Sequence, residues 1–330
     1  MSYTLQQVAT LTGAQIFGTT NPTIEWLLTD SRSLAYPETS LFFALHTRTG
    51  DGHRYIADLY RRGVRNFVVG TLPDDAQAHY PAANFLLVAS PLQALQTLTE
   101  QHRLRFDIPV VGITGSNGKT IVKEWIYQLL SPSETVTRSP RSYNSQIGVP
   151  LSVWLLNEHS RVALFEAGIS RPGEMHIISE LVCPSAAVVT NIGTAHLMEL
   201  GSRENIRDEK LKIQDGMQED AYIFRNADDA LLLAGALRED MISRTYGRAE
   251  TADCRAENVS LVNGCAEFTA NIRGERVEVK LGVPGEHQVW NALAALGVAE
   301  AYGVPLDGAA SELSKFKGYR HRQQIFERDG

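Results

Sequence analysis

The sequence predicts an α/β protein with mostly parallel sheets, and two observations lead to this prediction. Short apolar runs of strand length alternate with helical patterns, which is the order of parallel βαβ units. From Glu257 to Leu281 the apolar period shifts toward two, and turns at Val262-Asn263-Gly264 and Arg273-Gly274 interrupt it. We therefore expect a small antiparallel annex there. A chain of 330 residues has room for about two domains.

The first domain is expected over residues 1–89, followed by a connecting segment over residues 90–106. Thr71–Ala83 is rich in Pro, Ala and Asp and is predicted to be a surface loop. Alternating apolar patterns predict strands and helices in this part of the chain: strands at Ile24–Leu28, Ser40–Leu45, Asn66–Val69 and Asn84–Ala89, and helices at Tyr55–Arg62 and Pro91–Arg103.

The second domain is expected over residues 107–317, with the boundary at Phe106–Pro109. Its first helix has one apolar face at 3.6-residue spacing, formed by Ile121, Val122, Trp125, Ile126, Leu129 and Leu130. Further elements follow in alternation: strands at Pro109–Thr114, Arg161–Glu166, Ala186–Asn191 and Ala221–Arg225, and helices at Glu174–Leu181, Glu204–Met217 and Val289–Tyr302. Residues 318–330 are expected to begin a third domain that the chain does not complete.

Composition excludes several classes of protein. A net charge of −7 argues against a general nucleic-acid binder, because phosphate backbones select basic surfaces. The first residues lack the charged start and apolar core of a signal peptide, and no apolar run is long enough to cross a bilayer. The widely spaced Cys183, Cys254 and Cys265 form no C-x-x-C pair and are expected to be reduced. We expect a cytoplasmic protein without membrane insertion.

The strongest local signal is the glycine-rich segment Gly112–Thr120, which reads G-I-T-G-S-N-G-K-T between an apolar strand and an amphipathic helix. This is the context of a phosphate-binding loop, in which backbone N–H groups and a helix N-terminus face an anion. Lys119 is expected to reach the β- and γ-phosphates, and the Thr120 hydroxyl to bind Mg²⁺. The remaining nucleotide-binding residues are expected to be Gly115, Ser116, Asn117 and Gly118.

The loop departs from the strict pattern, because Ile113 stands where the first glycine is expected. The dinucleotide fingerprint is also unmet, since G-x-x-G-x-x-G replaces G-x-G-x-x-G. The Lys119-Thr120 pair favours a nucleoside triphosphate over NAD. A glycine-rich turn with a chance lysine is the alternative interpretation.

The form T-G-S-N-G-K-T resembles that of the Mur ligases, and further motifs of this family follow in order. They are Ser142–Pro150 (S-Y-N-S-Q-I-G-V-P), Phe165–Gly168 (F-E-A-G), Thr190–Leu197 (T-N-I-G-T-A-H-L) and Gly285–Ala292 (G-E-H-Q-V-W-N-A). Earlier in the chain, Thr29-Asp30-Ser31-Arg32 and Asp51-Gly52-His53 are similar to the UDP-contacting motifs. The resemblance covers essentially the whole chain.

The resemblance implies an N-terminal UDP-binding domain, a central ATP-binding domain and a C-terminal domain that this chain lacks. The implied activity is ATP-dependent amide ligation through an acyl phosphate, in peptidoglycan precursor synthesis. Within the family the chain looks most like the ligases that join D-alanyl-D-alanine to UDP-N-acetylmuramoyl-tripeptide. The segment Trp26–Leu34 is especially similar to the ligase half of fused ligase–alanine racemase proteins, so an alanine racemase is a further expected covalent partner.

The same resemblance assigns metal ligands and catalytic residues. Glu166 ends a buried strand and is expected to bind Mg²⁺, with a buried ion pair as the alternative. His196 is expected at a second Mg²⁺ site, although a lone histidine is more often structural. Lys210 is expected to be carbamylated and so to become an anionic ligand, with a solvated helix lysine as the alternative. Together with Lys119, these three residues are the expected catalytic group.

The remaining expected contacts are with the nucleoside and the peptide substrate. Asn291 is carried over from the adenine-side motif H-N-x-x-N, in which Gln288 replaces the first asparagine, while His287 caps a helix or belongs to the motif. Thr29, Asp30, Ser31 and Arg32 are expected to hold the UDP moiety, or else to form a capped turn. Asn144 and Ser145 are expected near the tripeptide or the metal-bound phosphate.

Three other functions share these features. A sister ligase that adds the third amino acid would use the same ATP chemistry. Folylpolyglutamate synthetase has a related central domain but lacks an N-terminal domain of the kind expected here. A nucleotide-binding module without turnover of its own is the third alternative, and we expect the 330-residue chain alone to turn over poorly.

Overall fold

The computed structural model describes residues 2–47, 50–316 and 318, and it divides the chain into two compact units. The first comprises Met1–Asp107 together with Gln146–Glu158, and the second comprises Ile108–Ser145 together with His159–Gly330. The sequence analysis placed a boundary at Phe106–Pro109 but did not anticipate that Gln146–Glu158 returns to the first unit. Apart from Gly318, the expected start of a third domain at residues 318–330 lies outside the described residues.

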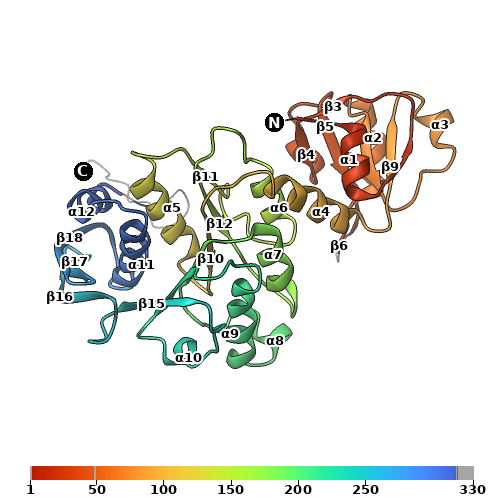
Figure 1. Cartoon of the computed structure of the whole chain (residues 1–330). Helices are drawn as coiled ribbons and strands as arrows, with labels where there is room; N and C mark the ends of the chain where they lie inside the picture. The colour runs from red at the N-terminus through yellow and green to blue at the C-terminus, as the bar shows by residue number, and fades with distance from the viewer. Residues whose placement is uncertain (1, 48–49, 317, 319–330) are drawn as a thin grey trace, which may run out of the picture. The chain divides into compact units, whose positions relative to one another are not determined.

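The first unit, drawn in red and orange in Figure 1, is built on a sheet of β-strands. This sheet has five strands in the order β2-β9-β8-β5-β4. Its neighbours pair in parallel except for β2 and β9, which are antiparallel. Helices cover two apolar cores, one with α1 and α4 and the other with α2. The bounds are β2 Gln15–Phe17, β4 Trp26–Leu28, β5 Ser40–Phe43, β8 Asn66–Val69, β9 Asn84–Leu87, α1 Leu5–Thr12, α2 Ile56–Arg61 and α4 Pro91–Arg103.

Two expected elements of this unit differ from the structure. The strand expected at Ile24–Leu28 is split, because the N–H groups of Glu25 and Trp26 both donate to the Thr39 carbonyl oxygen. The first part, β3 Thr23–Ile24, pairs instead with β1 Tyr3–Thr4. The loop expected at Thr71–Ala83 contains a short helix, α3 Ala76–His79. Two small strands, β6 His46–Thr47 and β7 Gly50–Asp51, pair with each other.

The returning segment is held by an aromatic cluster. Its helix α6, Gly148–Val153, leads to Trp154, whose ring stacks on that of Tyr3 at a centroid distance of 5.2 Å. The Tyr3 hydroxyl lies 2.8 Å from His102 Nδ1, and His102 Nε2 lies 3.1 Å from the Leu156 carbonyl oxygen. Because that carbonyl only accepts, these partners assign the proton to Nε2. Burial lowers the pKa of His102 to about 4.

The pKa of His102 predicts an acid-labile first unit. The unfolded chain takes up a proton near the ordinary pKa of 6.5, whereas the folded unit resists protonation until about pH 4. Stability is therefore lost as the pH falls through this window, by about 3 kcal/mol in total. Urea unfolding of the wild type and of His102→Gln is measured at pH 7 and at pH 4. Between these two pH values, the free energy of unfolding of His102→Gln should fall by about 3 kcal/mol less than that of the wild type. An equal loss in both proteins would contradict the assignment.

The second unit is built on a nine-stranded sheet in the order β11-β12-β10-β13-β14-β15-β16-β17-β18. Pairing is parallel from β11 to β16 and antiparallel among the last three strands, so the predicted α/β class is confirmed. The strands are β10 Val110–Thr114, β11 Val136–Arg138, β12 Val162–Glu166, β13 Ala186–Val189, β14 Tyr222–Asn226, β15 Ile242–Gly247, β16 Cys254–Val262, β17 Cys265–Ile272 and β18 Glu275–Pro284.

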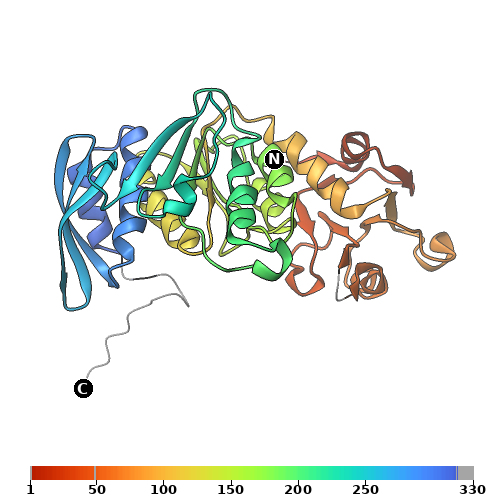
Figure 2. The same ribbon diagram turned by 90° about the horizontal axis from the view of Figure 1, so that it is seen from below.

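The predicted antiparallel strands are present, and they form the end of this large sheet. They join it through a short pairing of β15 with β16, at Tyr246↔Cys254 and Gly247↔Arg255. Figure 2 shows them in blue beside α11 and α12. The sequence analysis did not anticipate β15 or the helix α12, Leu306–Ser314, which packs against β18.

The helices of the second unit position the phosphate loop. The helices α5 Lys119–Leu130 and α11 Gln288–Ala301 pack together over the main core, which contains Trp125 and the alanine-rich face of α11. The remaining helices are α7 Glu174–Val182, α8 Leu197–Leu200, α9 Arg203–Leu211 and α10 Ala230–Leu233. The loop follows β10, which lies between β12 and β13, so the carboxyl ends of three parallel strands meet beside it. Open parallel sheets bind ligands at such an edge.

No helix in the described ranges has both the length and the apolar character needed to cross a bilayer.

Candidate active site

The phosphate loop joins the end of β10 to the start of α5 and depends on two glycines. Gly115 has a φ of +135°, and a Cβ there would lie 1.8 Å from Thr190 Oγ1. Gly118 has a φ of +85°, and a Cβ there would lie 2.5 Å from Asn291 Oδ1. Both the backbone conformation and the close neighbours therefore exclude a side chain at these positions.

Hydrogen bonds tie this loop to the segment that follows β13. The N–H of Ser116 donates to the Asn191 carbonyl oxygen at 3.0 Å, and the N–H of Asn117 donates to Asn191 Oδ1 at 3.1 Å. The N–H of Gly193 donates to Ser116 Oγ at 2.8 Å. The T-N-I-G motif thus holds the loop in place, a role that the sequence analysis did not assign to Asn191.

Lys119 is the first residue of α5, and its ammonium group lies over the loop. Its Nζ donates to the Gly115 carbonyl oxygen at 2.7 Å. The ammonium group and the helix N-terminus both place positive charge at the loop. This arrangement suits a polyphosphate.

Thr120 and Glu166 lie together beside the loop, as expected for a Mg²⁺ site. Thr120 Oγ1 lies 3.2 Å from Glu166 Oε2, and the two residues are 1% and 0% exposed. Glu166 Oε1 receives no hydrogen bond among the described residues but lies 3.0 Å from the Lys123 ammonium, so Oε2 is the oxygen that faces Thr120. A hydroxyl and a carboxylate with unused acceptor capacity fit a divalent cation that prefers oxygen.

Glu166 also takes part in a buried ion pair, which was the alternative interpretation of this residue. Lys123 Nζ lies 3.0 Å from Glu166 Oε1, and both side chains are 0% exposed. Sequence analysis missed Lys123, although its position among the apolar residues of α5 was a signal. The ion pair leaves the other oxygen, Oε2, facing Thr120.

His196 is exposed in the loop after β13 and has a left-handed backbone, with a φ of 63°. It does not join Glu166 in a cluster of His, Cys, Asp or Glu ligands. In the part of the chain that the structure describes, the one such group of three or more is His46, Asp51 and His53 in the first unit. The second Mg²⁺ site therefore stays a prediction.

Lys210 is buried on α9, where it is 3% exposed, and is not a solvated helix lysine. Burial, together with the nearby positive charge of Lys119, lowers its pKa to about 7, while Glu209 acts in the opposite direction. Lys210 therefore lies close enough to the phosphate loop for the charge of Lys119 to lower its pKa. A substantial fraction of its amine is neutral near pH 7, which is the form that reacts with CO₂.

A cavity of about 830 Å³ lies beside Gly118 and contains the expected nucleoside residue Asn291. Asn291 Nδ2 donates to Gln288 Oε1 at 2.9 Å, so the glutamine of the altered motif holds the asparagine. His287 stands at the N-cap of α11 without a capping side-chain hydrogen bond, which argues against the helix-capping interpretation. Sequence analysis missed Trp290 and Asp228, whose side chains bond at 2.6 Å on the cavity wall.

The segment with Asn144 and Ser145 runs alongside the end of β12. The Asn144 carbonyl oxygen accepts from the Gly168 N–H at 2.7 Å, and a Cβ on Gly168 would lie 3.0 Å from Asn144 Cγ. Ser142 Oγ lies 3.4 Å from Thr120 Oγ1. Asn144 is therefore close to the Glu166 strand end, whereas Ser145 is exposed.

In the first unit, the segment Thr29–Arg32 forms the capped turn that was the alternative interpretation. Asp30 caps the 3₁₀ helix Ser31–Ser33 and accepts from Arg32 Nη2 at 2.7 Å. The hydrogen bonds from Arg32 lower the pKa of Asp30. The Arg32 side chain is 87% exposed and points its guanidinium at Asp30, so a UDP phosphate would have to share it.

In the motif Asp51-Gly52-His53, the aspartate and the histidine line a cavity of the first unit, of about 420 Å³. Asp51 Oδ1 lies 2.6 Å from His53 Nδ1, and His53 Nε2 accepts from the Gly70 N–H at 3.1 Å. These partners assign the proton to Nδ1. Gly52 is required because a Cβ there would lie 2.7 Å from the Leu45 nitrogen.

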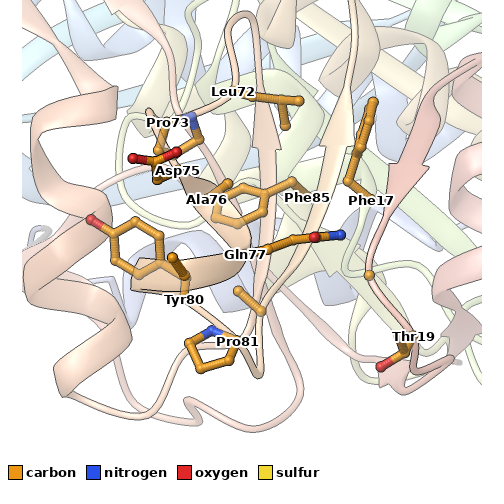
Figure 3. A pocket seen from close by; sticks show the side chains of 13 residues that line it. Phe17, Thr19, Leu72, Pro73, Asp75, Ala76, Gln77, Tyr80, Pro81 and Phe85 are labelled. Carbon is orange, nitrogen blue, oxygen red and sulfur yellow. The ribbon is translucent and has the colours of Figure 1, made fainter.

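A larger cavity of about 620 Å³ lies between β2, β9 and the α3 segment. Figure 3 shows the rings of Phe17, Tyr80 and Phe85 around it. One side of it is formed by Thr71–Ala83, which was expected to be a surface loop. Neither of these two cavities is lined by Thr29–Arg32.

Comparison with known proteins identifies one family. Residues 113–299 match the model of the Mur ligase middle domain. The chain is 32% identical to the UDP-N-acetylmuramoyl-tripeptide–D-alanyl-D-alanine ligase of Bacillus subtilis, over 93% of this chain and 65% of that protein. The chain therefore spans slightly less than two thirds of that relative.

Solved structures agree with the sequence match. A crystal structure of MurF from Acinetobacter baumannii superposes with a TM-score of 0.89 at 28% identity, covering 99% of this chain and 71% of the other. MurF ligase from Thermotoga maritima in complex with ADP gives a TM-score of 0.80 at 26% identity, covering 93% and 69%. The likeness extends over both units of the chain.

Proposed function

Because the chain belongs to the Mur ligase family, we propose that it is the nucleotide- and UDP-substrate-binding part of an ATP-dependent ligase that joins D-alanyl-D-alanine to UDP-N-acetylmuramoyl-tripeptide. The observation that carries this proposal is the phosphate loop with Lys119 at one side and the Thr120–Glu166 pair at the other. The names of the relatives support the substrates, and the ADP bound to the Thermotoga relative supports the nucleotide.

The proposed reaction has two steps. A terminal carboxylate oxygen of the tripeptide attacks the γ-phosphorus of ATP, and the bond to the β-phosphate oxygen breaks, so that an acyl phosphate and ADP form. The amine of D-alanyl-D-alanine then attacks the acyl carbon, inorganic phosphate leaves, and the amine loses a proton. The two reacting groups of the first step are both anionic, so positioning and positive charge dominate the catalysis.

The residues around the loop have complementary roles in this proposal. The backbone N–H groups at the start of α5 bind phosphate oxygens, and Lys119 offsets the charge that builds on the transferred phosphoryl group. Asn291, held by Gln288, lines the cavity proposed for the adenosine. Asn144 and Ser145 are proposed to contact the peptide end or the transferred phosphate.

Thr120 and Glu166 would hold a Mg²⁺ ion, and His196 with a carbamylated Lys210 would hold a second one. Bound Mg²⁺ supplies charge neutralisation on phosphate oxygens. What supports the first site is the close approach of Thr120 Oγ1 and Glu166 Oε2. What supports a modified Lys210 is its burial beside Lys119, since an ammonium cannot ligate a cation but a carbamate can.

Carbamylation of Lys210 is directly observable. The neutral amine adds to CO₂, forms a carbamate and releases one proton, so occupancy should rise with pH. With a pKa of about 7, the neutral fraction increases roughly tenfold between pH 6 and pH 8. At fixed dissolved ¹³CO₂ we expect a carbamate ¹³C resonance that grows over this range. The same resonance must be absent in Lys210→Ala; a signal that persists there would assign it to another amine.

In the first unit, Thr29–Arg32 and Asp51–His53 are proposed to bind the UDP moiety. The exposed Arg32 guanidinium supports a contact with the diphosphate, although Asp30 already accepts its hydrogen bonds. The similarity of Trp26–Leu34 to fused ligase–racemase proteins supports an alanine racemase as covalent partner. Sequencing the gene around this segment tests that partner, and a reading frame without a racemase would remove it.

The test of the substrate assignment is ADP release by the full-length protein. UDP-muramoyl-tripeptide with D-alanyl-D-alanine should support turnover, whereas UDP-muramoyl-dipeptide with a diamino acid should not. The reverse preference would favour the sister ligase. Nucleotide binding without ADP release under either condition would favour a module without turnover.

A further inference from the structure

Lys123 is a completely buried cation to which the proposed reaction gives no role. It lies one turn after Lys119 on α5, and its side chain is 0% exposed. Its Nζ donates to the carbonyl oxygens of Ser139, at 2.8 Å, and Arg141, at 2.6 Å. Burying an ammonium group costs several kcal/mol unless its partners compensate. A buried ammonium group is therefore stable only where several polar or charged partners surround it.

Lys123 is also the third member of a chain of alternating charges. Arg138 Nε lies 3.2 Å from Glu124 Oε2, Lys123 Nζ lies 3.2 Å from Glu124 Oε1, and Nζ lies 3.0 Å from Glu166 Oε1. Side-chain exposure falls along this series from 31% through 7% to 0% and 0%. The charges alternate in sign, so each buried charged group of the chain lies next to one of opposite sign.

The backbone that Lys123 holds is strained and belongs to the same site. Arg141 has a left-handed φ of 51°, a backbone conformation that is unfavourable for a residue with a Cβ. Ser139 Oγ accepts from the Glu166 N–H at 3.1 Å, and the segment continues to Ser142 beside Thr120. Strained conformations persist where surrounding contacts determine them. Here those contacts include both carbonyl bonds to Lys123.

We propose that Lys123 is a positioning residue, resting on the nucleotide function proposed above. One ammonium group fixes the Glu166 carboxylate and the Ser139–Arg141 backbone together, so that Glu166 Oε2 and Thr120 Oγ1 present a preformed pair of oxygens to the cation of a metal–nucleotide complex. Because its side chain is 0% exposed, the lysine acts through the groups that it holds. Its three N–H donors and its charge are both required, because the partners are two carbonyl groups and two carboxylates.

A purely structural ion pair would behave differently. Losing it would lower stability, but the folded molecules would bind metal–nucleotide as before. The positioning role predicts that the part of nucleotide affinity that depends on Mg²⁺ is lost while metal-free binding persists. The informative quantity is therefore the ratio of the Kd in EDTA to the Kd in saturating Mg²⁺.

The experiment compares Lys123→Gln/Glu124→Gln with Glu124→Gln alone. The double variant removes one cation and one anion, so the net buried charge is unchanged and folding is protected. Binding of a non-hydrolysable ATP analogue is measured by calorimetry with Mg²⁺ and with EDTA, and thermal unfolding is recorded in parallel. We expect the double variant to lose the Mg²⁺ enhancement by tenfold or more, with metal-free affinity within threefold of wild type. Glu124→Gln should keep the enhancement within threefold.

Two results overturn the proposal in distinguishable ways. If the double variant keeps the wild-type enhancement, Lys123 is only a structural residue and the nucleotide site stands. If the wild type itself binds no analogue under either condition, the nucleotide function fails and the role of Lys123 fails with it. A single Lys123→Gln variant with reduced enhancement and an unchanged metal-free Kd would support the proposal further.

Discussion

Replacing Lys119 with alanine is expected to weaken ATP binding by about 100-fold, with little effect on stability. The ammonium group supplies a charge-assisted contact to a polyphosphate, and losing such a contact costs about 2–3 kcal/mol. In the free protein the ammonium group makes a part-buried hydrogen bond to the Gly115 carbonyl oxygen. Losing this bond should change the free energy of unfolding less than losing the phosphate contact changes the free energy of ATP binding. Titration calorimetry with ATP and Mg²⁺ measures the effect.

Lys315 provides a matched control for this substitution. Its side chain is 61% exposed and pairs with Glu312 on α12, away from the phosphate loop. Lys315→Ala should bind ATP like the wild type. Wild-type affinity in Lys119→Ala would remove this lysine from the nucleotide site.

Replacing Gly115 with alanine is expected to abolish measurable nucleotide binding. The added Cβ would lie 1.8 Å from Thr190 Oγ1 and 2.9 Å from the Thr190 nitrogen, and the φ of +135° disfavours any side chain. The loop must therefore move away from the β13 end, which misdirects the N–H groups that bind phosphate. A loss of 3 kcal/mol or more, roughly 150-fold in affinity, is the expected scale.

Gly303→Ala separates this effect from the general cost of left-handed glycines. Gly303 has a φ of +76°, but a Cβ there would meet nothing within 4 Å. This variant should lose about 1 kcal/mol of stability and keep full nucleotide affinity. If Gly115→Ala bound nucleotide as well as Gly303→Ala does, the loop geometry described here could not be the binding geometry.

The phosphate loop was predictable because its signals are local. The apolar strand, the glycines and the amphipathic helix lie within one short stretch, and the structure places β10 and α5 as expected. The helix at Pro91–Arg103 was likewise marked by its own residues, with Ser90 capping it and Pro91 at its first position. Such elements depend little on distant parts of the chain.

Other features depend on distant contacts and could not be predicted in this way. The return of Gln146–Glu158 is stabilised by Trp154 packing against Tyr3, which is far away in sequence. The strand β15 is mostly polar and exists because β14 and β16 pair with it on either side. Lys123 and Glu166 look like separate charged residues in the sequence, and only the packing of α5 against β12 reveals their contact.

The central claim is that the loop at Gly115–Lys119 binds the triphosphate of ATP, and a crystal soaked with a non-hydrolysable ATP analogue and Mg²⁺ tests it most directly. We predict phosphate density against the N–H groups at the start of α5 and the Lys119 ammonium, with the base in the cavity beside Asn291. An empty loop at saturating analogue, or NAD bound there in preference, would contradict the account.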